Sequence, residues 1–95
     1  NNFQQTGSNK DIMDLKNLKD KWTSFGWHTT ELDGHNINDL YGCFLENEHI
    51  KKPKAIIANT IKGKGFTFSE NNNEWHHSVM TKSFYEKALK ELTKK

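Results

Sequence analysis

The sequence contains no arginine, one cysteine and one proline. Without arginine, it has none of the planar guanidinium groups that favour bidentate contacts to phosphates and base edges, so a dedicated nucleic-acid binder is disfavoured. The lone Cys43 excludes an intramolecular disulfide and a multi-cysteine metal site, and it fits a reducing compartment. No apolar run approaches the length of a membrane span or a signal-peptide core, so we expect no membrane association.

Apolar residues are also scarce. They make up 33% of the 95 residues, and counting glycine in place of tyrosine still leaves the total below the roughly 45–50% of ordinary globular domains. A chain of this length forms at most one small domain with a modest core. The composition therefore predicts a fold that is not self-sufficient.

The spacing of apolar residues predicts alternating helices and strands. Spacings of three and four residues indicate amphipathic helices, and β-branched or aromatic runs stopped by turn residues indicate strands. The predicted elements are, in chain order, a loop over residues 1–10, a helix over 11–25 that Gly26 ends, a strand over 27–32, a helix that Asn36 caps and Lys51–Pro53 ends, a strand over 55–60, a long loop over 62–80, and a helix from Thr81 or Ser83 to Lys95.

The strand over residues 55–60, AIIANT, is apolar at consecutive positions rather than alternate ones. This pattern is typical of a parallel strand buried on both faces by helices. The order helix, strand, helix, strand, long loop, helix thus predicts the α/β class, built from βαβ crossovers. Two strands cannot form such a sheet alone, so we expect missing neighbours, either upstream residues or a partner.

The motif KGKG, residues 62–65, follows this strand at the end where open parallel sheets bind ligands. Its glycines could let the backbone approach an anion, and its lysines supply charge. The motif alone is weak, because it matches neither GxxxxGK(S/T) nor GxGxxG, and out of context an ordinary turn is the favoured interpretation. The long loop over residues 62–80 favours a functional role, and its Phe66, Phe68 and Trp75 disfavour disorder.

The histidines and the cysteine have simple structural interpretations when each is taken alone. His76 and His77 are adjacent in the sequence, so we expect their side chains to diverge and not to bind one metal ion together. His35 stabilises the turn before a helix, His49 faces solvent, and Cys43 packs within that helix.

Three stretches taken together resemble a known family. They are FGWHTTELDGHNINDL at 25–40, KPKAIIANTIKGKGFTF at 52–68 with ENNNEWHH at 70–77, and NNFQQTG at 1–7. In order and spacing they resemble the C-terminal part of the thiamine-diphosphate-binding domain of transketolases. The resemblance covers residues 1–95 and implies a partial parallel-sheet thiamine-diphosphate-binding fold, incomplete without upstream strands. The last helix is similar to the end of the N-terminal subunit in two-subunit members.

The resemblance implies a reaction and a cofactor. Transketolases use thiamine diphosphate to carry a two-carbon ketol unit from a ketose phosphate to an aldose phosphate, in the carbohydrate metabolism and pentose phosphate pathway of the cytoplasm. The diphosphate is held by Mg²⁺ or Ca²⁺, which suits an oxygen-only shell. Matching the family's N-x-(L/I) pattern implies that Asn1 supplies its side-chain oxygen and Phe3 its carbonyl to this metal ion.

The same resemblance implies roles for three further residues. His76 matches the histidine that lies near cofactor phosphate and substrate, where it donates to an oxygen that gains charge. Lys62 and Gln5 match positions that approach the cofactor in some members. His77 stands where many members have glycine, so no role is transferred to it.

Two family features are absent from the sequence. The GDG motif, whose aspartate binds the metal ion, is missing, and so is the glutamate that activates the cofactor from the pyrimidine-binding domain. We therefore expect these 95 residues to be inactive alone and to work with a pyrimidine-binding C-terminal domain or subunit, as a homodimer or heterotetramer. The alternatives are a non-catalytic phosphate-binding or interaction module on the same scaffold and, less favoured, a lysine-rich nucleic-acid binder.

Overall fold

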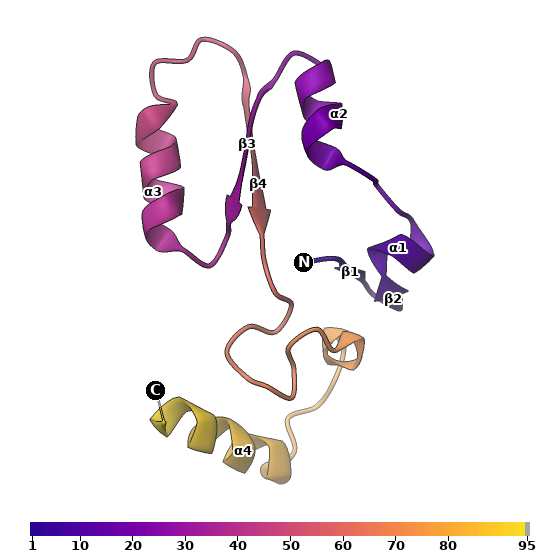
Figure 1. Cartoon of the computed structure of the whole chain (residues 1–95). Helices are drawn as coiled ribbons and strands as arrows, with labels where there is room; N and C mark the ends of the chain where they lie inside the picture. Colours follow the sequence, from indigo (N-terminus) through magenta and orange to yellow (C-terminus); the bar gives the residue numbers. More distant parts are fainter. Residues whose placement is uncertain (95) are drawn as a thin grey trace. The chain divides into compact units, whose positions relative to one another are not determined.

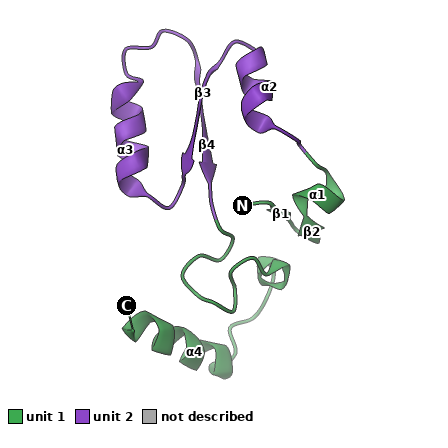
Figure 2. Ribbon diagram, viewed as in Figure 1, with its two compact units in different colours: residues 1–14, 61–95 green, residues 15–60 purple. Residues whose placement is uncertain are grey.

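The structure, a computed structural model, describes residues 1–94. The chain divides into two compact units, one formed by residues 1–14 with the residues from 61 onward, the other by Leu15–Thr60 (Figure 2). In chain order the elements are β1 (Phe3–Gln4), β2 (Gly7–Ser8), α1 (Asn9–Ile12), α2 (Leu18–Ser24), β3 (His28–Asp33), α3 (Ile37–Glu46), β4 (Lys54–Asn59), the 3-10 helix η1 (Asn73–His76) and α4 (Lys82–Thr93) (Figure 1).

The unit Leu15–Thr60 is a βαβ arrangement with one additional helix. Strands β3 and β4 pair in parallel over their whole length, with His28 opposite Lys54 and Asp33 opposite Asn59. Helix α3 connects the two strands, and α2 lies on the other side of the strand pair from α3 (Figure 1). The predicted α/β class and the parallel pairing are therefore confirmed.

Asn36 begins α3 as predicted. Its side-chain oxygen accepts a hydrogen bond from the Asp39 amide at 3.1 Å, which satisfies one of the free amides of the first turn. The backbone amide of Asn36 itself donates to the Asp33 carbonyl at 3.1 Å. The helix ends at Glu46, before the Lys51–Pro53 stretch that was predicted to end it.

The prediction of one helix over residues 11–25 is wrong, because the chain forms two shorter helices, α1 and α2. Between them, Lys16 has a φ of +57°, outside the right-handed helical region. The side-chain oxygen of Asn17 accepts from the Asp20 amide at 3.0 Å, so Asn17 caps a new helix instead of continuing the first. Helix α2 ends where expected, because Gly26 follows it with a φ of +90°.

The prediction of a loop over residues 1–10 is also wrong, since these residues form a small hairpin and the start of α1. Strands β1 and β2 pair antiparallel, with Gln5 and Thr6 as the turn between them. Ser8 then caps α1, because its hydroxyl oxygen accepts from the Asp11 amide at 3.3 Å and donates to the Asp11 carboxylate at 2.9 Å. Short polar side chains that suggest a loop here build local structure instead.

The predicted long loop over residues 62–80 is ordered by an aromatic cluster. The ring of Phe68 lies 5.7 Å from Phe66, 5.3 Å from Trp75 and 5.1 Å from Phe84 of α4, measured between centroids. Trp75 meets Phe84 edge to face at 5.0 Å. Such pairs add about 0.5–1.5 kcal/mol each beyond the area that they bury. The loop is therefore ordered, as its aromatic residues predicted, and the rings hold it against α4, which the sequence did not predict.

A second contact fixes the same loop to α4. The Glu91 carboxylate accepts from the Thr67 amide at 2.8 Å and from the Thr67 hydroxyl at 2.5 Å. A carboxylate that accepts two hydrogen bonds forms a stronger link than a neutral acceptor does. The loop thus begins its path along α4 close to the glycine-rich turn.

The apolar side chains are incompletely buried. In the described part of the chain, only Cys43 and Ala88 are buried apolar residues, whereas Ile37, Tyr41 and Phe44 on α3 are 73%, 66% and 64% exposed. The prediction that the strand over residues 55–60 is buried on both faces is not met within residues 1–94, because residues 55–57 are only half-buried and Ala58 and Asn59 are exposed. Among the described helices, none has the length and hydropathy that crossing a membrane requires.

We expect Gly63→Ala to lower the free energy of unfolding by about 2–3 kcal/mol, because the position has a φ of +73° and an added Cβ would lie 2.3 Å from the Ser69 carbonyl oxygen. The measurement is urea unfolding of the full-length protein that contains this chain. Gly42→Ala is the matched control, since nothing lies within 4 Å of a Cβ there and the residue is helical. The control should change stability by no more than about 1 kcal/mol, in the stabilising direction. Equal losses in both variants would contradict the close packing of this turn.

Candidate functional site

The residues predicted to form the site lie in one of the two compact units. This unit joins the N-terminal hairpin to the segment that runs from the glycine-rich turn to α4. The middle of the chain, Leu15–Thr60, contributes none of them. The predicted site residues in this unit are Asn1, Phe3, Gln5, Lys62 and His76.

The two oxygens predicted to bind the metal ion, those of the Asn1 side chain and the Phe3 carbonyl, belong to the start of the hairpin. The side-chain oxygen of Asn1 accepts a hydrogen bond from the Phe3 amide at 3.0 Å, which leaves one further acceptor site on that oxygen. Asn2 has a φ of +66°, and its carbonyl accepts from the Asn9 amide at 2.8 Å, which closes the base of the hairpin. Neutral oxygens of this kind are suitable ligands for a hard cation.

Mg²⁺ and Ca²⁺ take six or more ligands, so these two oxygens alone would not complete a metal shell. Within residues 1–94, no group of three or more histidine, cysteine, aspartate or glutamate side chains could hold a metal ion.

The backbone groups of the KGKG turn form hydrogen bonds within the loop. The amide of Lys64 donates to the Ile61 carbonyl at 3.1 Å, and the amide of Gly65 donates to the Glu70 carboxylate at 3.2 Å. The Lys62 carbonyl accepts from the Asn71 amide at 2.9 Å. The amides of Lys64 and Gly65, which could have approached an anion, are thus already bonded, and the turn itself requires Gly63. The turn also carries two lysine side chains, the half-buried Lys62 and the exposed Lys64, and Lys62 is the one predicted to approach the cofactor.

The 3-10 helix η1 carries His76 as its last residue. Its first turn is capped by Asn72, whose side-chain oxygen accepts from the Glu74 amide at 3.0 Å. The side-chain amide of Asn73 donates to the Gln5 carbonyl at 2.8 Å, so the hairpin and η1 are directly linked. His76 and His77 are both exposed and accessible to a ligand.

Asn73 is the residue at this site that the sequence analysis did not identify. Its signal is the run of three asparagines before the Trp-His-His motif, which composition alone does not distinguish from a polar loop. The contact with Gln5 joins residues 68 positions apart, so no local pattern could reveal it.

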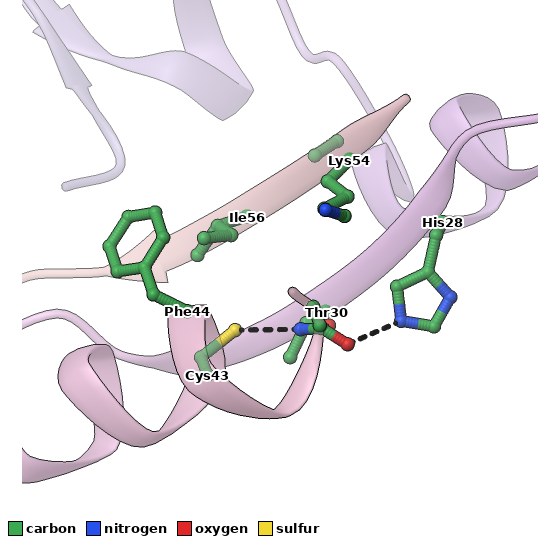
Figure 3. Close-up of a pocket in the computed structure, with 8 residues that line it drawn as sticks. His28, Thr30, Cys43, Phe44, Lys54 and Ile56 are labelled. Atoms are coloured by element: carbon green, nitrogen blue, oxygen red, sulfur yellow. Dashed lines mark hydrogen bonds between the residues drawn. The ribbon is translucent and has the colours of Figure 1, made fainter. Parts of the chain in front are cut away.

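A separate cavity lies within the βαβ unit (Figure 3). It has a volume of about 120 Å³ and is lined by residues of β3, β4 and α3. The His28 Nε2 lies 2.9 Å from the Asn47 side-chain oxygen, and the Asn47 amide donates to the Cys43 thiol sulfur at 3.2 Å. Because that oxygen can only accept, Nε2 carries the hydrogen. Cys43 is 5% exposed, which agrees with the packing role predicted for it.

No protein-family model matches the chain. The chain is 35% identical over 96 aligned residues to an apulose-4-phosphate transketolase subunit of Phocaeicola vulgatus, covering 100% of this chain and 34% of the relative. It is 38% identical over 95 residues to the 6-deoxy-6-sulfo-D-fructose transketolase subunit SqwG of a Clostridium species, covering 99% and 34%. Human transketolase is 38% identical over 69 residues, covering 73% and 11%.

The chain spans about a third of the length of the first two relatives, and the similarity extends over essentially all of it. The resemblance seen in the sequence motifs is thereby confirmed. The chain belongs to the transketolase family.

Proposed function

We propose that the chain is part of a transketolase that transfers a two-carbon ketol unit from a ketose phosphate to an aldose phosphate, with thiamine diphosphate and Mg²⁺ or Ca²⁺. The observation that supports this most directly is similarity along the whole chain to two transketolase subunits. We further propose that residues 1–95 are the C-terminal part of the thiamine-diphosphate-binding domain, in an enzyme of cytoplasmic carbohydrate metabolism. The two relatives are named for different sugars, so the proposal covers the reaction class and not the sugar.

The hairpin would hold the cation. Asn1 would contribute its side-chain oxygen and Phe3 its carbonyl, and both donor types fit a hard cation. The hydrogen bond from the Phe3 amide to the Asn1 oxygen, at 3.0 Å, supports this, because it orients the side chain beside the Phe3 backbone. Gln5 lies at the turn of the same hairpin and would approach the cofactor from there.

The segment after β4 would contact phosphate and sugar. When bound, thiamine diphosphate supplies the carbon nucleophile that carries the two-carbon unit. The Lys62 ammonium would offset phosphate charge as a point charge rather than as a bidentate group. The exposed His76 imidazole would donate a hydrogen bond to phosphate or to the sugar oxygen that gains negative charge.

A partner chain or domain completes the proposal. Both of the relatives that match the whole chain are named as transketolase subunits, which supports an assembly of more than one chain. The exposed Ile37, Tyr41 and Phe44 side chains of α3 support it too, since an apolar helix face of this kind gains free energy when another surface covers it. We propose that the assembly supplies the pyrimidine-binding domain and the remaining metal ligands, as a homodimer or heterotetramer.

The proposal is tested by assaying ketol transfer with the full-length protein and its partner subunit, using a panel of ketose and aldose phosphates. Turnover should require both thiamine diphosphate and Mg²⁺, and EDTA should abolish it. If the complete assembly binds sugar phosphates but transfers no ketol unit, the alternative of a non-catalytic phosphate-binding module is the correct one.

The isolated chain should be inactive in the same assay. Its sequence lacks the GDG aspartate and the glutamate that activates the cofactor in the family, so we expect turnover at the level of the cofactor alone. Mixing residues 1–95 with the partner subunit alone should not restore activity. Measurable thiamine-dependent turnover by residues 1–95 alone would contradict the division of the site proposed above.

We expect His76→Ala to lower kcat/KM for ketol transfer about 100-fold, because a hydrogen-bond donor to developing charge is lost. The dissociation constant for thiamine diphosphate should stay within about threefold if His76 acts mainly on the substrate, since one such donor contributes little to cofactor affinity. His49→Ala is the matched control, because His49 is also exposed but lies in the other compact unit. Unchanged turnover in His76→Ala would remove this histidine from the site.

A further inference from the structure

The three consecutive asparagines before Trp75 make three different contacts. Asn71 has a φ of +52° and donates its backbone amide to the Lys62 carbonyl at 2.9 Å, which turns the chain back. Asn72 caps η1 and also donates its side-chain amide to the Phe68 carbonyl at 3.2 Å. Asn73 donates its side-chain amide to the Gln5 carbonyl at 2.8 Å. The first two contacts shape the loop, whereas the third reaches the hairpin.

In the third contact, a buried hydrogen-bond acceptor of Asn73 remains without a partner. The side-chain oxygen of Asn73 is buried and has no hydrogen-bond partner, although the rest of the residue is only half-buried. Rotating the amide by half a turn would point this oxygen at the Gln5 carbonyl, which is itself an acceptor. The Gln5 carbonyl therefore fixes the orientation of the Asn73 amide.

Folding stability alone does not favour asparagine at position 73. A buried acceptor without a partner costs about 1–3 kcal/mol, which offsets the bond that the amide makes. Leucine has nearly the same shape and has no such oxygen. Gln5 is exposed, so its carbonyl could bond to water if the asparagine amide were absent. What leucine could not provide is a directional link between the hairpin turn and η1.

We propose that Asn73 is a positioning residue that sets the place of His76 relative to the hairpin that carries Asn1 and Phe3. This proposal rests on the proposed function, because it concerns the distance between the two halves of that site. A 3-10 helix as short as η1 has little stability of its own. Its place depends on contacts at its two ends, through Asn73 to Gln5 and through Trp75 to the aromatic cluster.

The first test measures position without any cofactor. In the full-length protein, Asn73→Leu should increase hydrogen exchange at least about tenfold in the peptides that cover residues 3–8 and 72–77. Exchange in β3 and β4 should not change, and the free energy of unfolding should be equal or higher. Asn38→Leu is the matched control, since Asn38 is an exposed asparagine of α3. Unchanged exchange in both peptides would overturn the positioning role.

The second test measures whether Asn73 acts through His76. Asn73→Leu should lower kcat/KM for ketol transfer about tenfold, since small misplacements of reacting groups carry costs of this size. In a His76→Ala background, the same change should cost less than about twofold, because residues that act on one step are not additive. Two full, additive losses would overturn the proposal, and so would an Asn73→Leu enzyme with wild-type kcat/KM.

These outcomes separate this proposal from the proposed function. If the unaltered assembly shows no thiamine-dependent transfer, the proposed function fails, while the exchange experiment still decides whether Asn73 links the hairpin to η1. If the unaltered assembly is active and the Asn73 effects are absent, only the positioning role fails.

Discussion

The packing of Phe68 against Phe66, Trp75 and Phe84 is the interaction on which the candidate site most depends. Ordering a long connection costs about 1–2 kcal/mol of backbone entropy per residue, which scattered polar contacts cannot offset. The aromatic rings provide the buried apolar surface that the rest of this loop lacks. Because Trp75 directly precedes His76, the same rings that order the loop also restrain the backbone at His76.

The hydrogen bonds of the glycine-rich turn distinguish between two interpretations of the KGKG motif. A KGKG sequence at the end of a parallel strand can be a backbone cradle for an anion or an ordinary turn. The Lys64 and Gly65 amides are bonded within the loop, and the Gly63 carbonyl accepts from the Ser69 hydroxyl at 2.9 Å. The turn therefore uses its backbone for folding. Recognition of a diphosphate at this point would have to come from lysine side chains and a bound cation.

The elements that the sequence predicted well are those whose signals are local. The strand predicted over residues 27–32 is observed at His28–Asp33, and the one over 55–60 at Lys54–Asn59, because β-forming runs bounded by turn residues mark both ends. The helix predicted over 11–25 failed because its apolar spacing continues through Lys16, where the backbone leaves the helical region. Periodicity reports which face is apolar, and it does not report where a polar side chain ends one helix and caps another.

The family resemblance predicts the candidate site residue by residue, but no local pattern in the sequence predicts the contact between Asn73 and Gln5. The contact between Asn73 and Gln5 joins the two ends of the chain, and neither residue has an apolar pattern that would predict it. Polar contacts of this kind contribute little net free energy to folding, so amino-acid composition and residue spacing give almost no indication of them. They nevertheless determine direction, because a hydrogen bond weakens steeply as its angle departs from linear. In this compact unit, apolar packing therefore orders the loop, and a directional polar contact links η1 to the hairpin.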